Sequence, residues 1–180
     1  MKEPQIVQAH NLSFELMFSE QKIKARVEEL GKVLREKYKD KTPLFLGVLN
    51  GAYVFTADLA RAFGEPCEIS FIKLSSYSGL ESTGEVATVI GLTTDVKDRH
   101  IIIVEDIIDT GKTMHEFLPM LKKMNPASVA FTTFLLKPDA LKHDVQIDYI
   151  GFEIPNKFVI GYGMDYNELG RNLRGIYQLK

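Results

Sequence analysis

Hydrophobic positions along the chain follow two patterns, one typical of helices and one typical of buried strands. Between Ser19 and Tyr38, apolar residues recur every three or four positions among charged neighbours, at Ile23, Val27, Leu30, Leu34 and Tyr38. This spacing predicts an amphipathic helix with Ser19 as its N-cap. Residues 44–49 then run as LFLGVL without polar alternation, which predicts a strand buried on both faces.

The remaining patterns repeat this alternation of strands and helices. Asn50 and Gly51 interrupt the chain before a second helical pattern at 52–63. A third helical stretch covers 113–124, where Pro119 predicts a kink or a break because proline has no backbone N–H. The other apolar runs are predicted strands, at 69–74, 101–104, 129–136, 149–154 and 158–160.

Strands that alternate with helices indicate an α/β fold built on a mostly parallel twisted sheet flanked by helices. No repeat or interdomain linker interrupts the chain, so we expect residues 1–180 to form a single domain. Residues 75–84, with the sequence SSYSGLESTG, are rich in serine and glycine and have few core residues, which predicts a mobile loop. Ligands of such sheets bind beyond the carboxyl ends of the strands, which directs attention to the loops after Leu49 and Val104.

Composition narrows the class of protein. Hydrophobic residues make up 45% and charged residues 26%, as in ordinary globular proteins, so a mainly disordered chain is excluded. No apolar stretch is long enough for a membrane span or a secretory signal, which predicts a cytoplasmic protein with no membrane partner. The net charge of -2 argues against nucleic acid as a partner. Cys67 is the single cysteine and cannot form an internal disulfide.

One segment contains an unusual concentration of carboxylates, hydroxyls and glycine. The predicted strand at 101–104 is followed directly by EDIIDTGKT, with carboxylates at Glu105, Asp106 and Asp109. Adjacent acids at a buried strand's end need solvent, a cation or hydroxyl donors, which suggests a sugar or a metal-bound polyol. The following turn offers backbone N–H groups and hydroxyls at a helix N-terminus, which suits a phosphate.

The segment also admits two other interpretations. A nucleotide triphosphatase loop requires glycine five residues before Gly111, and that position is Asp106, so the triphosphatase pattern fails. Simple capping of a helix would account for Asp109 or Thr110 alone, but not for the whole segment.

The segment IIIVEDIIDTGKT resembles the phosphoribosyl pyrophosphate motif of the purine phosphoribosyltransferases, specifically their hypoxanthine-guanine branch. Residues 49–51 resemble the family's pyrophosphate loop, and Ser76 with Tyr77 its catalytic flexible loop. Residues 136–138 and PNKFVIGYGMDYNE resemble its purine pocket. The resemblance implies the type I phosphoribosyltransferase fold, with a small hood formed by the N- and C-terminal segments.

The resemblance implies a role for each matching residue. Asp109 would be the catalytic acid/base group beside N7 of the base. The phosphoribosyl group would be bound by Glu105, Asp106, Asp109, Thr110, Gly111, Lys112 and Thr113, with the 5′-phosphate at the last four. The purine set would be Ile107, Lys137, Phe158, Val159, Met164 and Asp165, with Lys137 donating to the 6-oxo group.

The resemblance also implies Mg²⁺ as cofactor, with Glu105, Asp106 and Asp165 as metal residues. The pyrophosphate residues would be Asn50, Gly51 and Arg171. Relatives often carry lysine where Asn50 stands, so the charge that this loop contributes to pyrophosphate binding is open.

The implied activity is purine salvage. The 5-phosphoribosyl group would pass from phosphoribosyl pyrophosphate to hypoxanthine and/or guanine, giving IMP or GMP and pyrophosphate. The family is usually dimeric or tetrameric, which implies a homodimer or homotetramer. The alternatives are a regulatory protein that senses phosphoribosyl pyrophosphate and binds nucleic acid, and a phosphoribosyltransferase for xanthine or a pyrimidine.

Three of these residues also have purely structural interpretations. Phe158 could belong to the core, Lys137 could be a solvated strand end, and Arg171 could pair with Glu168 on a helix surface.

Overall fold

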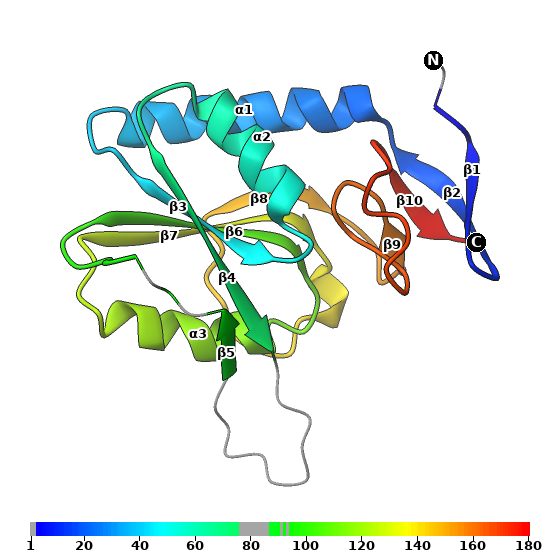
Figure 1. Ribbon diagram of the computed structural model, residues 1–180. Helices are drawn as coiled ribbons and strands as arrows, with labels where there is room; N and C mark the ends of the chain where they lie inside the picture. Colours follow the sequence, from blue (N-terminus) through cyan, green and yellow to red (C-terminus); the bar gives the residue numbers. More distant parts are fainter. Residues whose placement is uncertain (1–2, 76–86, 91, 93) are drawn as a thin grey trace, which may run out of the picture.

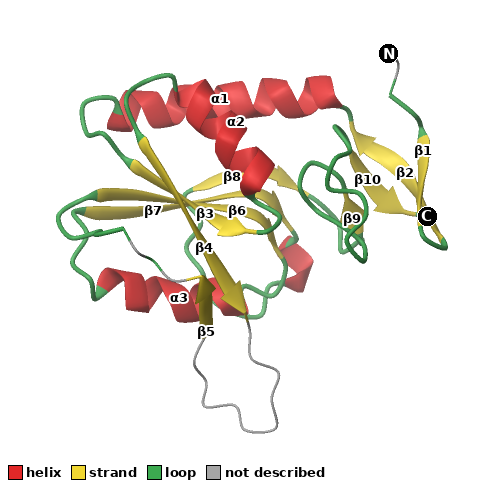
Figure 2. Ribbon diagram, in the orientation of Figure 1, coloured by secondary structure: helices red, strands yellow, loops and turns green. Residues whose placement is uncertain are grey.

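The computed structural model describes residues 3–75, 87–90, 92 and 94–180, which form two sheets with helices on both faces of the larger one (Figures 1 and 2). Ser76 and Tyr77, the predicted flexible-loop residues, lie outside the described residues. Within the described part of the chain, no helix is long and apolar enough to cross a membrane.

The large sheet has the strand order β5-β4-β3-β6-β7-β8. Strands β4, β3, β6, β7 and β8 run parallel to one another, and β5 pairs antiparallel with β4 at the edge. This confirms the mostly parallel sheet. The strands are β3 (Leu44–Leu49), β4 (Glu68–Ser75), β5 (Ala87–Ile90), β6 (His100–Ile108), β7 (Ser128–Leu136) and β8 (Tyr149–Glu153).

Three helices cover the two faces of this sheet. Helices α1 (Glu20–Tyr38) and α2 (Tyr53–Phe63) lie on one face and α3 (Lys112–Lys122) lies on the other (Figure 1). The predicted N-cap is confirmed, since the Ser19 hydroxyl accepts a hydrogen bond from the Lys22 N–H at 3.3 Å. The predicted inward residues of α1 are all buried, so its periodicity does reflect packing on the sheet.

The second sheet is the predicted hood. Its order is β1-β2-β10-β9, all antiparallel, and it joins the two ends of the chain (Figure 2). The strands are β1 (Ile6–Ala9), β2 (Leu12–Phe18), β9 (Val159–Ile160) and β10 (Ile176–Leu179). The apolar run at 158–160 was predicted as part of the strand-helix series, which is wrong, because β9 pairs with β10 in the hood.

Two further expectations are corrected. Strand β6 does not end at Val104, because its pairing with β7 continues to Ile108, so Glu105 and Asp106 lie within a strand. Helix α3 does not break at Pro119 but continues to Lys122. Pro119 is exposed, so the carbonyl that a proline leaves without an N–H partner can be hydrated.

The division into domains stays a prediction. One core cluster contains Val159 and Ile176 of the hood together with Phe45 and Phe134 of the large sheet, so the two sheets share buried apolar surface.

Candidate active site

Three parts of the fold meet around a cavity of about 250 Å³ beyond the carboxyl ends of the central strands. The end of β6, the residue after β7 and the hood supply its walls. The lining residues are Asp106, Ile107, Asp109, Lys137, Phe158, Val159, Met164 and Asp165. The cavity therefore contains all six residues of the predicted purine set together with Asp109, although the sequence separates them into three segments.

The most buried charge in this cavity is the Lys137 ammonium. Lys137 is 7% exposed, and its Nζ donates to Oδ2 of Asp109 at 2.8 Å. The Asp109 side chain is half exposed, so one end of the ion pair faces the cavity mouth while the other is held inside the protein. Lys137 is thus not a solvated strand end.

Aromatic and apolar side chains provide the flat surfaces of the cavity. Phe158 is 46% exposed and is therefore not a core residue. Its ring packs against that of Tyr166 in a T-shaped arrangement, with ring centroids 5.8 Å apart. Met164 and Val159 are buried, so their contribution to the cavity is fixed by packing in the shared core. An exposed aromatic face beside a buried cation is suited to a flat heterocycle with an acceptor on its edge.

The two adjacent acids of β6 are desolvated. Oε2 of Glu105 is buried with no hydrogen-bond partner among the described residues. Burial, and then the nearby Asp106 carboxylate, raise the pKa of Glu105 well above its ordinary value. Burial raises the pKa of Asp106 to about 6, opposed by the Ile107 N–H, which donates to Oδ1 at 2.8 Å, and by the charge of Arg171.

A cation would relieve both carboxylates. In the stretches of chain that the structure describes, no group of three or more His, Cys, Asp or Glu side chains could enclose a metal by itself. Mg²⁺ does not require such a cage, because it keeps several waters and is commonly held by one or two carboxylates with substrate phosphates. The unpartnered Oε2 of Glu105 and the adjacent Asp106 carboxylate are oxygen ligands of the kind that Mg²⁺ binds.

The buried Asp106 carboxylate should cost stability in the metal-free protein. Because its folded pKa is raised, its contribution favours folding below the ordinary pKa and is lost as the pH rises through about 6. We expect Asp106→Asn to increase the free energy of unfolding by about 1–3 kcal/mol at pH 7.5 and to change it little at pH 4. Urea unfolding in EDTA measures this, with the exposed Asp139→Asn as control; equal effects at the two pH values would contradict it.

Gly51 permits a close approach of two backbones and one carboxylate. A Cβ built on Gly51 would collide with Oδ2 of Asp106, and one built on Gly163 would collide with the Gly51 carbonyl. The peptide bond between Leu49 and Asn50 is cis. Gly51 is therefore a spacer that brings the β3–α2 loop against β6 on one side and the hood on the other.

Substitution of this spacer should damage the site. We expect Gly51→Ala to lower kcat/KM by at least about 10²-fold, because the new methyl group displaces the Asp106 carboxylate. Overpacking should also cost about 1–3 kcal/mol of stability. The matched control is Gly31→Ala, which crowds Ala62 between α1 and α2 far from the cavity and should lower Tm without changing kcat/KM. Equal losses of kcat/KM in both variants would contradict a local role.

Arg171 and Asp165 form the second ion pair of the site. Nη2 of Arg171 lies 2.7 Å from Oδ1 of Asp165, and Nη1 donates to the Gly163 carbonyl at 2.8 Å. Oδ2 of Asp165 accepts from the Glu168 N–H at 2.7 Å. The alternative pairing of Arg171 with Glu168 on a helix surface is wrong, because this segment forms no helix and Arg171 pairs with Asp165.

The turn before α3 has the geometry of a backbone cradle. Gly111 is the N-cap with φ +78°, a left-handed conformation that glycine adopts without strain, and no side chain caps the helix. The Lys112 N–H points to the Thr110 hydroxyl at 3.4 Å. The capping explanation of this segment is therefore wrong for Asp109, whose carboxylate faces Lys137 instead. Thr113 lies in the first turn of the helix.

Tyr162 and Gly163 were missed as candidate residues. Gly161, Tyr162 and Gly163 all have positive φ, at +103°, +49° and +102°. The signal was present in the sequence, since two glycines flanking one residue permit a tight left-handed turn. What the pattern does not show is that this turn seats Gly163 on Gly51.

Comparison with known proteins identifies the family. Residues 17–167 match the model of the phosphoribosyl transferase domain. The hypoxanthine-guanine phosphoribosyltransferase of Aquifex aeolicus is 39% identical over 167 residues, covering 92% of this chain and 94% of that protein. The hypoxanthine phosphoribosyltransferase of Salmonella typhimurium is 41% identical over 162 residues, covering 88% and 91%.

Solved structures agree with this relationship. The crystal structure of a hypoxanthine phosphoribosyltransferase from Staphylococcus aureus superposes with a TM-score of 0.87 at 37% identity, covering 92% of this chain and 91% of that one. The chain belongs to the phosphoribosyltransferase family and has its type I fold.

Proposed function

We propose that this protein is a purine-salvage enzyme that transfers the 5-phosphoribosyl group from phosphoribosyl pyrophosphate to hypoxanthine and/or guanine, giving IMP or GMP and pyrophosphate. The observation that carries this proposal is the buried Lys137 ammonium, paired with Asp109 at 2.8 Å in a cavity that also presents Phe158. A lysine has three donors and no acceptor, so it selects a base with an oxygen acceptor at its edge.

In this proposal the base lies on Phe158, with Ile107 and Met164 on the cavity's other surfaces. The backbone of Val159 reads the base edge. Lys137 donates to the 6-oxo group and keeps its contact with Asp109, since an ammonium can serve both acceptors. Asp109 is then placed to manage the proton on N7 of the base as its N9 bonds to the ribose.

The sugar and its phosphates lie on either side of this base. Glu105 and Asp106 hold the ribose hydroxyls, and the 5′-phosphate occupies the cradle of Thr110, Gly111, Lys112 and Thr113. Asn50, Gly51 and Arg171 hold the pyrophosphate. Asn50 is exposed and uncharged, so the β3–α2 loop would contribute backbone groups and Arg171 would supply the positive charge.

Mg²⁺ fits the carboxylates of this site and would be held by Glu105 and Asp106 with the ribose, and by Asp165 with the pyrophosphate. When bound it neutralises the charge that leaves with pyrophosphate. Both Asp165 oxygens already accept contacts from Arg171 and Glu168, so Asp165 would hold the ion through water or by exchanging one of these contacts. The carboxylates meanwhile tolerate the positive charge that develops on the ribose.

The protein's wider setting is part of the same proposal. We expect a single-domain cytoplasmic enzyme that forms a homodimer or homotetramer and acts on small molecules rather than on nucleic acid.

A base-by-base assay tests the function. Turnover of hypoxanthine, guanine, xanthine and adenine with phosphoribosyl pyrophosphate and Mg²⁺ is compared as kcat/KM. Hypoxanthine or guanine should be used far better than adenine. Absence of nucleotide formation from either 6-oxopurine would overturn the proposal, and preference for xanthine would reassign the base.

A further inference from the structure

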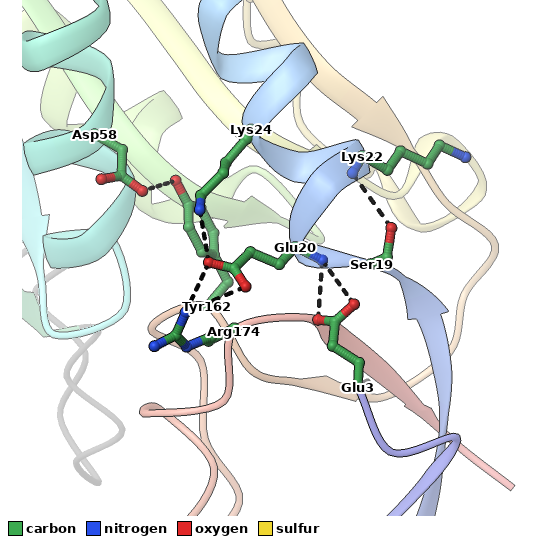
Figure 3. Close-up of polar contacts among 8 residues, drawn as sticks. All are labelled: Glu3, Ser19, Glu20, Lys22, Lys24, Asp58, Tyr162 and Arg174. Atoms are coloured by element: carbon green, nitrogen blue, oxygen red, sulfur yellow. Dashed lines mark hydrogen bonds and ion pairs between the residues drawn. The ribbon is translucent and has the colours of Figure 1, made fainter. Parts of the chain in front are cut away.

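A partly buried hydrogen bond connects the hood to helix α2 next to the site. The Tyr162 hydroxyl donates to Oδ2 of Asp58 at 2.9 Å, and the two residues are 104 positions apart in the chain. Tyr162 is 5% exposed. Figure 3 shows its side chain extending from the hood turn to the Asp58 carboxylate on α2.

The rest of the Tyr162 side chain is held on the core. Its ring packs against Phe134 of β7, with centroids 4.8 Å apart. Burial and the Asp58 carboxylate both raise the pKa of Tyr162 above its ordinary value, so the hydroxyl stays protonated and remains a donor. Both the ring and the hydroxyl of Tyr162 are therefore held in place, so Tyr162 can fix the position of the hood turn relative to α2.

Backbone hydrogen bonds connect the segment around Tyr162 to Arg171, a residue of the site. The Tyr162 N–H donates to the Leu173 carbonyl at 2.9 Å, and the Gly163 N–H donates to the Arg171 carbonyl at 3.0 Å. Arg171 returns a hydrogen bond from its guanidinium to the Gly163 carbonyl. Gly163 in turn leaves no room for a Cβ against the Gly51 carbonyl, two residues before α2 begins.

We infer that Tyr162 and Asp58 are a positioning pair, which fixes the hood turn carrying Asp165 and Arg171 against the loop carrying Gly51. The inference rests on the proposed function and goes beyond it, because neither residue lines the purine cavity. The pair sets the separation between the two parts of the pyrophosphate site. Lys137 and Ile107 are held by the large sheet, but Met164 of the purine set lies two residues after Tyr162 in the same turn, so binding of the base should weaken as well.

The surroundings indicate that the pair can be broken without unfolding the protein. Tyr162 and Asp58 border a second cavity of about 260 Å³, together with Tyr53, Lys24 and Arg174. Asp58 is partly exposed there, so water can replace the tyrosine hydroxyl as its partner. Tyr162→Phe keeps the ring contact with Phe134.

The experiment compares Tyr162→Phe and Asp58→Ala with the parent enzyme. Both variants should raise KM for phosphoribosyl pyrophosphate about tenfold, the effect of one lost hydrogen bond. The kcat should stay within about threefold, because a displaced turn weakens ground-state and transition-state binding together. Asp58→Asn keeps an oxygen acceptor and should behave as the parent. The double variant Tyr162→Phe with Asp58→Ala should be no worse than either single variant.

The matched control is Tyr177→Phe, which removes the hydroxyl of another buried tyrosine in the hood and should leave every constant unchanged. A fall in Tm with unchanged KM in Tyr162→Phe would overturn the inference, as would an Asp58→Asn variant as impaired as Asp58→Ala. A rise in KM in Tyr177→Phe would also overturn it. Calorimetric binding of phosphoribosyl pyrophosphate with Mg²⁺ gives the same comparison without turnover, so an inactive parent enzyme would remove the proposed function and leave the pair testable.

Discussion

Asp109→Asn is expected to lower kcat about 10²- to 10⁴-fold, the usual contribution of a positioned proton-transfer group. Asparagine preserves the size of the side chain and an oxygen that can face Lys137, but it cannot take up the N7 proton. Hypoxanthine binding should change much less than kcat. Steady-state kinetics with saturating phosphoribosyl pyrophosphate and Mg²⁺ measure the effect.

The structure adds a stability effect to this variant. Lys137 is 7% exposed and Asp109 is its ion-pair partner, so the substitution leaves a buried ammonium with a neutral acceptor only. We expect a loss of about 1–2 kcal/mol in the free energy of unfolding. The control is Asp139→Asn, which removes an exposed carboxylate close by in sequence and should alter neither quantity. If Asp109→Asn kept kcat within about threefold of the parent, Asp109 would only balance the charge of Lys137.

The unmutated enzyme should reject adenine in favour of hypoxanthine by roughly 10⁴- to 10⁵-fold in kcat/KM. Adenine presents a 6-amino donor to Lys137, which can only donate, so the buried ammonium would lose its acceptor on the base. Unpaired buried polar groups cost far more than a missing contact at the surface. Comparable turnover of the two bases would remove the assigned role of Lys137.

Lys137→Met should reduce the preference for hypoxanthine over adenine, mainly by lowering kcat/KM for hypoxanthine. We expect kcat/KM for hypoxanthine to fall by about 10²-fold or more, as the charged hydrogen bond to the 6-oxo group and the partner of Asp109 are both lost. Adenine turnover should fall much less. The control Lys123→Met replaces an exposed lysine at the end of α3 and should leave the ratio of the two bases unchanged. An unchanged ratio in Lys137→Met would show that another group selects the base.

Most of the large sheet could be predicted from local patterns. The buried face of α1 and the uninterrupted apolar run of β3 are each visible within a single element, and Gly51 marks the break between β3 and α2. The prediction of β6 stopped four residues too early, because two carboxylates suggested a strand end although pairing with β7 continues to Ile108. The strand at 158–160 was assigned to the wrong series, since an apolar run does not specify its partner.

The motif around residues 105–113 also predicts a site for a phosphorylated sugar. It could not show that Asp109 and Lys137 form an ion pair, that Arg171 pairs with Asp165, or that Gly51 touches the Asp106 carboxylate. Each of these contacts depends on the relative position of separate elements. The charge balance of the site is therefore a property of the fold.

The sequence by itself determined the helices and most of the parallel strands of the large sheet, their alternation, and the types of side chain available for a phosphorylated sugar and a base. Those properties depend on neighbours within one turn or one pleat. Tertiary structure alone decided how β2 and β10 join in the hood, where Glu15 faces Gln178, and how Tyr162 reaches Asp58. Such pairings are selected by the burial of apolar surface over the whole molecule, and the spacing of apolar residues within one element does not specify them.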